Sequence, residues 1–194
     1  MTAQFNDQFH YHDKDFSVAG ISAGELFNPA DFGLFPIPAS TACWRGYVAV
    51  FAISDSHLVL DSLSVNLEKE QAPTINGILP SEPTRGLRLF NNVYTGLKYR
   101  IPYTGGLLLG HDFISELYVH MGFHPAWKYK EVFELTFENG RLVSELDRSE
   151  WADQQRRDFL ESSRNDQPDK MPTKKEISNF VERAFDRTYK KGIN

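Results

Sequence analysis

The sequence predicts an α+β protein with a mainly antiparallel β-sheet or half-open barrel, built from hairpins and followed by two C-terminal helices. Two segments, 47–67 and 131–146, show the apolar alternation and central turn of a β-hairpin. Aromatic residues form 13% of the chain, which favours sheet. Residues 147–194 instead place apolar side chains at helical spacing.

The N-terminal part of the chain leads into the first hairpin. Residues 1–40 mix phenylalanines with Gly, Pro, Asp and Asn, so we expect loops and short strands, with a turn at 28–31. Residues 47–53 are apolar on both faces, which predicts a strand covered on both sides. A polar turn at 54–57 and a return strand at 58–67 complete the hairpin.

The middle of the chain is less regular. Residues 68–86 contain three prolines and two glycines and predict a long loop, of the kind that often has a functional role. Short strands are expected at 87–90, 93–99 and 106–109. Residues 113–121 favour a short helix, with Asp112 as its N-cap and Gly122 as its end. A strand is the alternative, because Tyr and Val at 118–119 favour extended backbone.

The second hairpin turns at Asn139-Gly140, a pair that favours a type I′ turn with positive φ at both positions. The two hairpins also align with a shift of 84 residues, which places 51–59 over 135–143. This match indicates either a duplicated β unit or the generic patterning that amphipathic hairpins share.

Capping-box patterns begin at Asp147 and Thr173. They predict a helix at 149–164, a polar linker at 161–172, and a last helix that ends at Gly192. The expected organisation is a β-rich body, 1–146, with a helical extension, 147–194, packed on it as part of a single domain.

Charge and composition limit the possible partners. The net charge is -5, and the body alone carries a net charge of -6, so phosphate backbones would be repelled and nucleic acid is not an expected partner. No apolar run approaches the roughly 18 residues that span a bilayer. A polar start and a single cysteine, Cys43, favour a cytoplasmic protein. The sequence does not determine the oligomeric state.

One group of residues could bind a metal. If residues 113–121 and their continuation are helical, Glu116, His120 and His124 share one face, and they would be suitable ligands for a divalent transition metal. Gly122 and Pro125 interrupt that helix, so a structural histidine pair is the alternative. No other cofactor is expected.

Other side chains are candidates for binding a partner. Trp and Arg dominate binding hot spots, and the candidates are Trp44, Arg45, Tyr47 and Trp127. Arg45 could also activate Cys43 as a thiolate, although a buried apolar cysteine is the commoner case.

Three classes of function remain open from sequence. The first is a protein-binding module, antidote-like or regulatory, whose acidic surface best matches a basic protein partner. The second is a small-ligand-binding β-rich protein or enzyme with an aromatic-lined cavity. The third is a metal-dependent enzyme that uses Glu116, His120 and His124.

Overall fold

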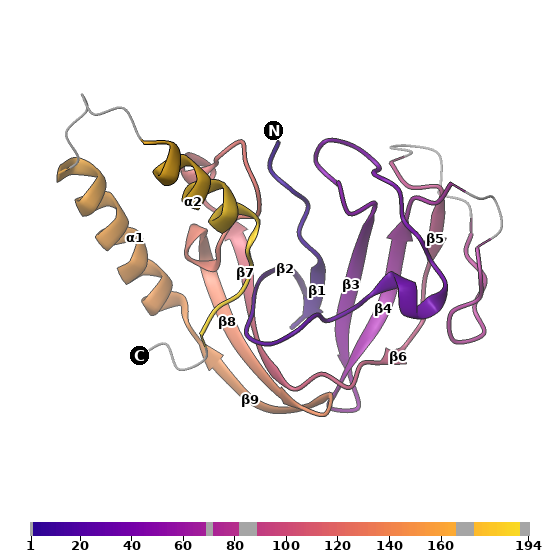
Figure 1. Ribbon diagram of the computed structural model, residues 1–194. Helices are drawn as coiled ribbons and strands as arrows, with labels where there is room; N and C mark the ends of the chain where they lie inside the picture. The colour runs from indigo at the N-terminus through magenta and orange to yellow at the C-terminus, as the bar shows by residue number, and fades with distance from the viewer. Residues whose placement is uncertain (1, 69–71, 82–88, 166–172, 191–194) are drawn as a thin grey trace.

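A nine-stranded mixed sheet forms the body of the protein (Figure 1). The computed structural model describes residues 2–68, 72–81, 89–165 and 173–190. The strands are β1 (Gln8–Tyr11), β2 (Lys14–Ile21), β3 (Tyr47–Ser54), β4 (His57–Val65), β5 (Asn92–Tyr94), β6 (Tyr99–Arg100), β7 (Gly105–Phe113), β8 (Tyr129–Glu138) and β9 (Arg141–Asp147). Their order is β3-β1-β2-β7-β8-β9-β4-β5, and β6 pairs with β4. The α+β class and the antiparallel bias are confirmed, but a parallel β1–β3 pair makes the sheet mixed and not a clear barrel.

Both predicted hairpins are present, as β3–β4 and β8–β9. In the second turn Asn139 and Gly140 have φ of 46° and 80°. In the first turn Asp55 and Ser56 have φ of 48° and 62°. Positive φ at both central positions is what a type I′ turn requires, and its twist matches that of the flanking strands.

The two hairpins meet turn to turn. Leu58 N donates to Gly140 O at 2.8 Å, and Leu142 N donates to Ser56 O at 2.9 Å. Between them β4 pairs with β9 at His57 and Arg141. The 84-residue shift carries Leu58 onto Leu142 and Ser56 onto Gly140, so it exchanges these two hydrogen bonds. The sequence match therefore corresponds to a local two-fold arrangement of the hairpins.

Aromatic side chains fill the main core, on the inner face of the sheet. The largest fully buried rings are Phe9, Phe16, Phe51, Tyr94 and Phe137. Strand β3 is fully buried on this face only, at Ala49 and Phe51. The expectation that β3 is covered on both sides was therefore wrong, since its alternate residues remain partly exposed.

The N-terminal arm contains more regular structure than loops and short strands. Strand β2 has eight residues and lies inside the sheet, between β1 and β7. The predicted turn at 28–31 forms a 3-10 helix, η1 (Pro29–Phe32), whose first turn is capped when Ala30 N donates to Asn28 Oδ1 at 3.0 Å. Of the other predicted short strands, 106–109 lies within β7, and 93–99 is strand only at its ends, in β5 and β6. The strand predicted at 87–90 is absent at 89–90, and 87–88 fall outside the described residues.

The short helix expected at 113–121 does not form. Strand β7 continues through Phe113, which pairs with Tyr129 of β8, so the predicted helix start is extended, and only the short turn at 115–117 follows. Asp112 is no N-cap, because it lies in the strand and its carboxylate accepts from Lys130 Nζ at 2.9 Å. Between β7 and β8 the chain forms two 3-10 turns, η2 (Ser115–Leu117) and η3 (Ala126–Lys128).

Helices α1 (Ser149–Asn165) and α2 (Lys174–Phe185) lie beside the β7–β8–β9 side of the sheet (Figure 1). Ser149 N donates to Asp147 Oδ1 at 2.8 Å at the start of α1. Helix α2 ends at Phe185, well before Gly192, because the chain beyond it forms a parallel bridge at Thr188 with Ile21 of β2. Ile21 N donates to Arg187 O at 2.8 Å, and Tyr189 N donates to Ile21 O at 3.2 Å. We call residues 186–190 the strap. In the part of the chain that the structure describes, neither helix is long and apolar enough to span a bilayer.

Candidate functional site

The outer face of β2, β7 and β8 carries a second, smaller apolar cluster. Its buried members are Ala19, Leu108, Ala126, Tyr129, Val132 and Ala152. Beside this cluster η3, α1 and the strap enclose a groove of about 550 Å³. We call it the aromatic groove, because five Phe, Trp and Tyr side chains line it, namely Phe123, Trp127, Trp151, Phe159 and Tyr189.

Two glycines of the sheet let the strap lie close to the floor of this groove. A Cβ at Gly106 would overlap the hydroxyl of Tyr189. A Cβ at Gly20 would lie 3.1 Å from both Tyr189 and Leu108, tighter than most such contacts. Tyr189 can therefore pack onto the strands because these positions have no side chain.

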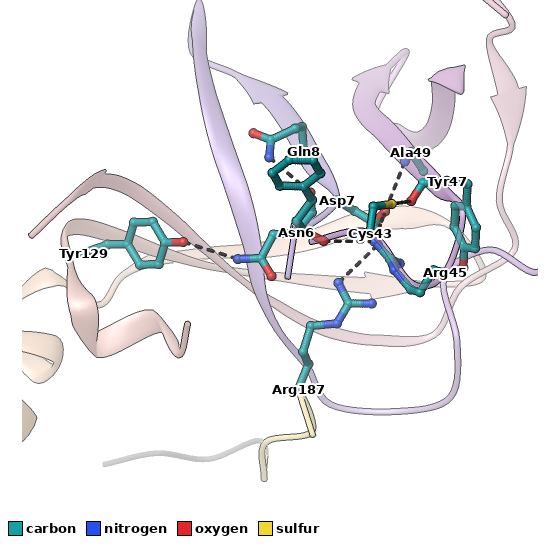
Figure 2. A network of polar contacts seen from close by, with 10 residues as sticks. Asn6, Asp7, Gln8, Cys43, Arg45, Tyr47, Ala49, Tyr129 and Arg187 are labelled. Atoms are coloured by element: carbon teal, nitrogen blue, oxygen red, sulfur yellow. Dashed lines mark hydrogen bonds and ion pairs between the residues drawn. The ribbon is translucent and has the colours of Figure 1, made fainter. Parts of the chain in front are cut away.

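The strap is held at one end by Asp7, a buried carboxylate (Figure 2). Arg45 binds both carboxylate oxygens, with Nη1–Oδ2 of 2.8 Å and Nη2–Oδ1 of 3.0 Å. Arg187 of the strap adds a third bond, Nη1 to Oδ2 at 3.1 Å, and Ala49 N donates to Oδ1 at 3.0 Å. Burial raises the pKa of Asp7, but the two guanidiniums and the backbone N–H outweigh burial and lower it below 3.8.

A second buried carboxylate, Glu134 of β8, holds the other part of the strap. Tyr189 OH donates to Glu134 Oε1 at 3.0 Å, and Arg148 donates to Oε2 at 2.8 Å. Burial, followed by the charge of Glu134, raises the pKa of Tyr189, so its hydroxyl stays protonated and can donate. Asp7 thus binds Arg45 of the body and Arg187 of the strap. Glu134 binds Arg148, which directly precedes α1, and Tyr189 of the strap.

Two polar side chains of the groove wall lack polar partners among the described residues. Lys128 is 7% exposed, and its Nζ lies 5.5 Å from the centroid of the Trp127 ring. Both ring nitrogens of His124 are buried and unpaired, and its ring packs against Phe113 at 4.7 Å. Burial, reinforced by the nearby Lys128 charge, lowers the pKa of His124 to about 4, and burial also lowers the pKa of Lys128.

The predicted binding residues separate into two places. Arg45 and Tyr47 belong to the Asp7 network, with the guanidinium carbon of Arg45 4.6 Å from the centroid of the Tyr47 ring. Trp44 lies beside them but points outward, 53% exposed, and stacks on Phe185 of α2 at 6.3 Å. Trp127 lies apart from these three, in the wall of the aromatic groove, against Phe159 at 4.9 Å.

The predicted metal ligands do not share a helix face, because the helix is absent. Glu116 lies in the exposed η2 turn, His120 is exposed in the following loop, and His124 is buried among aromatic rings. Across residues 2–68, 72–81, 89–165 and 173–190, no group of three metal-ligating side chains gathers. The spacing argument for a metal site therefore has no geometric support in this part of the chain.

Cys43 does not resemble an activated nucleophile. It is buried, and its Sγ donates to Tyr47 O at 3.4 Å. Burial raises the pKa of its thiol in spite of the nearby Arg45 charge. It is better described as a small apolar residue of the core.

Sequence reasoning missed the residues that hold the strap and the lysine of the groove, namely Asp7, Glu134, Arg187, Tyr189 and Lys128. A signal existed for Glu134 alone, since an acid within the apolar alternation of β8 indicates a paired buried charge. The rest depend on contacts over long sequence separations. Comparisons with protein-family models, with curated proteins and with solved structures gave no match to this chain.

Proposed function

We propose that the protein binds a small, largely apolar ligand in the aromatic groove. The observation that carries this proposal is the groove itself, about 550 Å³ between η3, α1 and the strap. Pockets for small ligands usually measure about 300–1,000 Å³ and have apolar walls with a few polar groups. Five rings and Lys128 fit that description. The proposal corresponds to the ligand-binding alternative from sequence.

The way the groove is built supports this proposal. Its floor is a hydrogen-bonded sheet, and one wall is the strap, fixed through Arg187 and Tyr189. The opposite wall is η3 against α1, where Arg156 Nη1 donates to Trp127 O at 2.9 Å and to Tyr129 O at 2.7 Å. A groove fixed on both sides needs little ordering on binding, which favours affinity.

A neutral dye tests the groove without any contribution from charge. N-phenyl-1-naphthylamine should bind with enhanced fluorescence in a saturable titration. Replacing Phe159, which is 46% exposed, by serine should weaken binding about two- to tenfold, because an aromatic contact contributes roughly 0.5–1.5 kcal/mol. Val119→Trp, which places a large ring at the rim, should compete for the same space.

Phe35→Ser is the matched control, because Phe35 is also an exposed phenylalanine, at 74%, and does not line the groove. Its dye affinity should equal that of the wild type. If the dye does not bind, or if Phe159→Ser and Val119→Trp bind it as the wild type does, the groove is not a ligand site.

Protein binding is a second candidate, and the exposure of Trp44 favours it. Trp44 and Phe5 are exposed apolar side chains on joined segments, since Phe5 N donates to Ala42 O at 2.9 Å. Together with the acidic body they would suit a basic protein. Affinity purification from the native host should then recover a stoichiometric partner, and Trp44→Ser should lose it while Phe35→Ser keeps it. Equal recovery by both variants would exclude Trp44 as the contact.

A further inference from the structure

We propose that the ligand of the aromatic groove is an aromatic monocarboxylate whose carboxylate pairs with Lys128. This inference rests on the proposed function, because it names the class of ligand for the same groove. It starts from the charged side chains that line the groove in the described part of the chain, which are Lys128, Asp186 and Arg187.

Two of these three charged side chains already have polar partners in the protein. Arg187 forms an ion pair with Asp7 at 3.1 Å. Asp186 is exposed to solvent, and its carboxylate accepts from Thr188 N at 2.8 Å and from Thr188 Oγ1 at 2.9 Å.

Lys128 differs from both. Its stem is buried, and among the described residues its Nζ forms no ion pair and no hydrogen bond, only the contact with the Trp127 ring. His124 beside it supplies no counter-charge, because an imidazole is either neutral or positive. Unlike the His124 nitrogens, the Lys128 Nζ keeps contact with solvent while the stem of the side chain is buried. An ammonium without an anion beside an apolar groove can form a charge-assisted hydrogen bond with the carboxylate of a bound ligand.

The walls indicate what the rest of the ligand is. Trp127 and Phe159 form a tilted pair at 4.9 Å, and Trp151 also lines the groove. Rings of this kind favour another flat ring through stacked or edge-to-face contact. An aromatic body with one carboxylate would therefore satisfy both Lys128 and the walls.

Two soluble probes of nearly equal shape test the head group. 1-Naphthaleneacetate carries the carboxylate, and 1-naphthaleneacetamide replaces it with a neutral amide. Isothermal titration should show the carboxylate binding to the wild type at least about tenfold more tightly, because hydrogen bonds to charged groups contribute roughly 1.5–3 kcal/mol. In Lys128→Met the preference should disappear, through weaker binding of the carboxylate and nearly unchanged binding of the amide.

Lys130→Met is the matched control, since Lys130 lies two residues away on an exposed position and pairs with Asp112. It should keep the preference. Equal binding of the two probes to the wild type would overturn the head-group inference, a result that does not depend on whether Lys128→Met folds. Dye binding without binding of either probe would overturn it too, while leaving the groove as a ligand site. If neither the dye nor the probes bind, the proposed function itself fails.

Discussion

Asp7 and Arg187 lie 180 residues apart in the chain, yet Arg187 Nη1 donates to Asp7 Oδ2 at 3.1 Å inside the protein. This bond joins the two ends of the described chain. It also fixes the strap that forms one wall of the aromatic groove, so that the stability of the fold and the shape of the groove depend on the same contact.

The first prediction compares the two arginines that bind Asp7. Arg187→Met should lower the free energy of unfolding by about 1–2 kcal/mol, because Asp7 keeps its two bonds to Arg45. Arg45→Met should cost about 3 kcal/mol or more, because the buried acid then keeps one cationic partner, Arg187, beside the Ala49 N–H. Urea denaturation measures both. Arg100→Met, at an exposed position, is the control and should change little, and the reverse order of the two costs would contradict the network.

The second prediction concerns the space that Gly106 leaves for Tyr189. Gly106→Ala should destabilise the protein by about 1–3 kcal/mol, because its Cβ would overlap the tyrosine hydroxyl. Tyr189→Phe removes that oxygen together with its bond to Glu134. The loss of unfolding free energy in the double variant should therefore be smaller, by at least about 1 kcal/mol, than the sum of the losses in the two single variants. Additive losses would mean that the two residues are not in contact.

The hairpins were predictable because their information is local. Asn139-Gly140 specifies its turn, and the alternation on either side of it specifies which face is buried. The strap was not predictable. Residues 186–190 continue a helical pattern in the sequence, but pairing with Ile21 and the bond to Asp7 favour extended backbone instead. Local propensity was overridden by partners more than 160 residues away in the chain.

In the candidate site, too, residues with a local signal could be predicted from the sequence, and residues that depend on tertiary contacts could not. Trp127 could be selected as a binding residue from its type alone, and it lines the groove. The metal site from Glu116, His120 and His124 depended on a helix, but that stretch begins with the end of β7 and contains only a short 3-10 turn. The importance of Lys128 comes from its burial, which no pattern around it in the sequence indicates.

The third prediction is a pH dependence that arises from His124. Its pKa is about 4 in the folded protein against 6.5 as the ordinary value, so between these values the unfolded chain binds the proton more readily. Stability should therefore fall as pH decreases through this window, by about 2 kcal/mol at pH 5. Lys128 is the neighbouring charge, and it opposes protonation.

His124→Phe should remove this loss. At pH 7 its stability should be close to that of the wild type, because an apolar ring replaces an imidazole whose nitrogens are unpaired. At pH 5 it should be the more stable of the two proteins in urea denaturation. His120→Phe, at an exposed position, should follow the wild type at both pH values. If His124→Phe keeps the wild-type decline, other groups are responsible for it.

The fourth prediction concerns Cys43, which is 2% exposed and whose thiol has a raised pKa through burial. Iodoacetamide should alkylate the folded protein at least about a hundredfold more slowly than the chain in urea, because only an accessible thiolate reacts. Mass spectrometry of the time course measures both rates, and the unfolded sample should reach one label per chain. Rapid labelling of the folded protein would instead support the hypothesis from sequence that Arg45 activates Cys43 as a nucleophile.

The last prediction links the strap to the ligand. Because strap residues form one wall of the groove, Arg187→Met should weaken binding of N-phenyl-1-naphthylamine even though Arg187 is engaged with Asp7. Binding and strap docking are then coupled, and coupling is reciprocal. A saturating dye concentration should slow hydrogen exchange at Ile21 and Tyr189, whose amides form the bonds between β2 and the strap. The turn amide of Gly140, which donates to Tyr103 O at 2.7 Å on another part of the sheet, is the internal control and should not change. If Arg187→Met retains dye binding and hydrogen exchange at Ile21 is unaffected by the dye, the ligand contacts η3 and α1 alone. The strap then stabilises the fold but does not contribute to ligand binding.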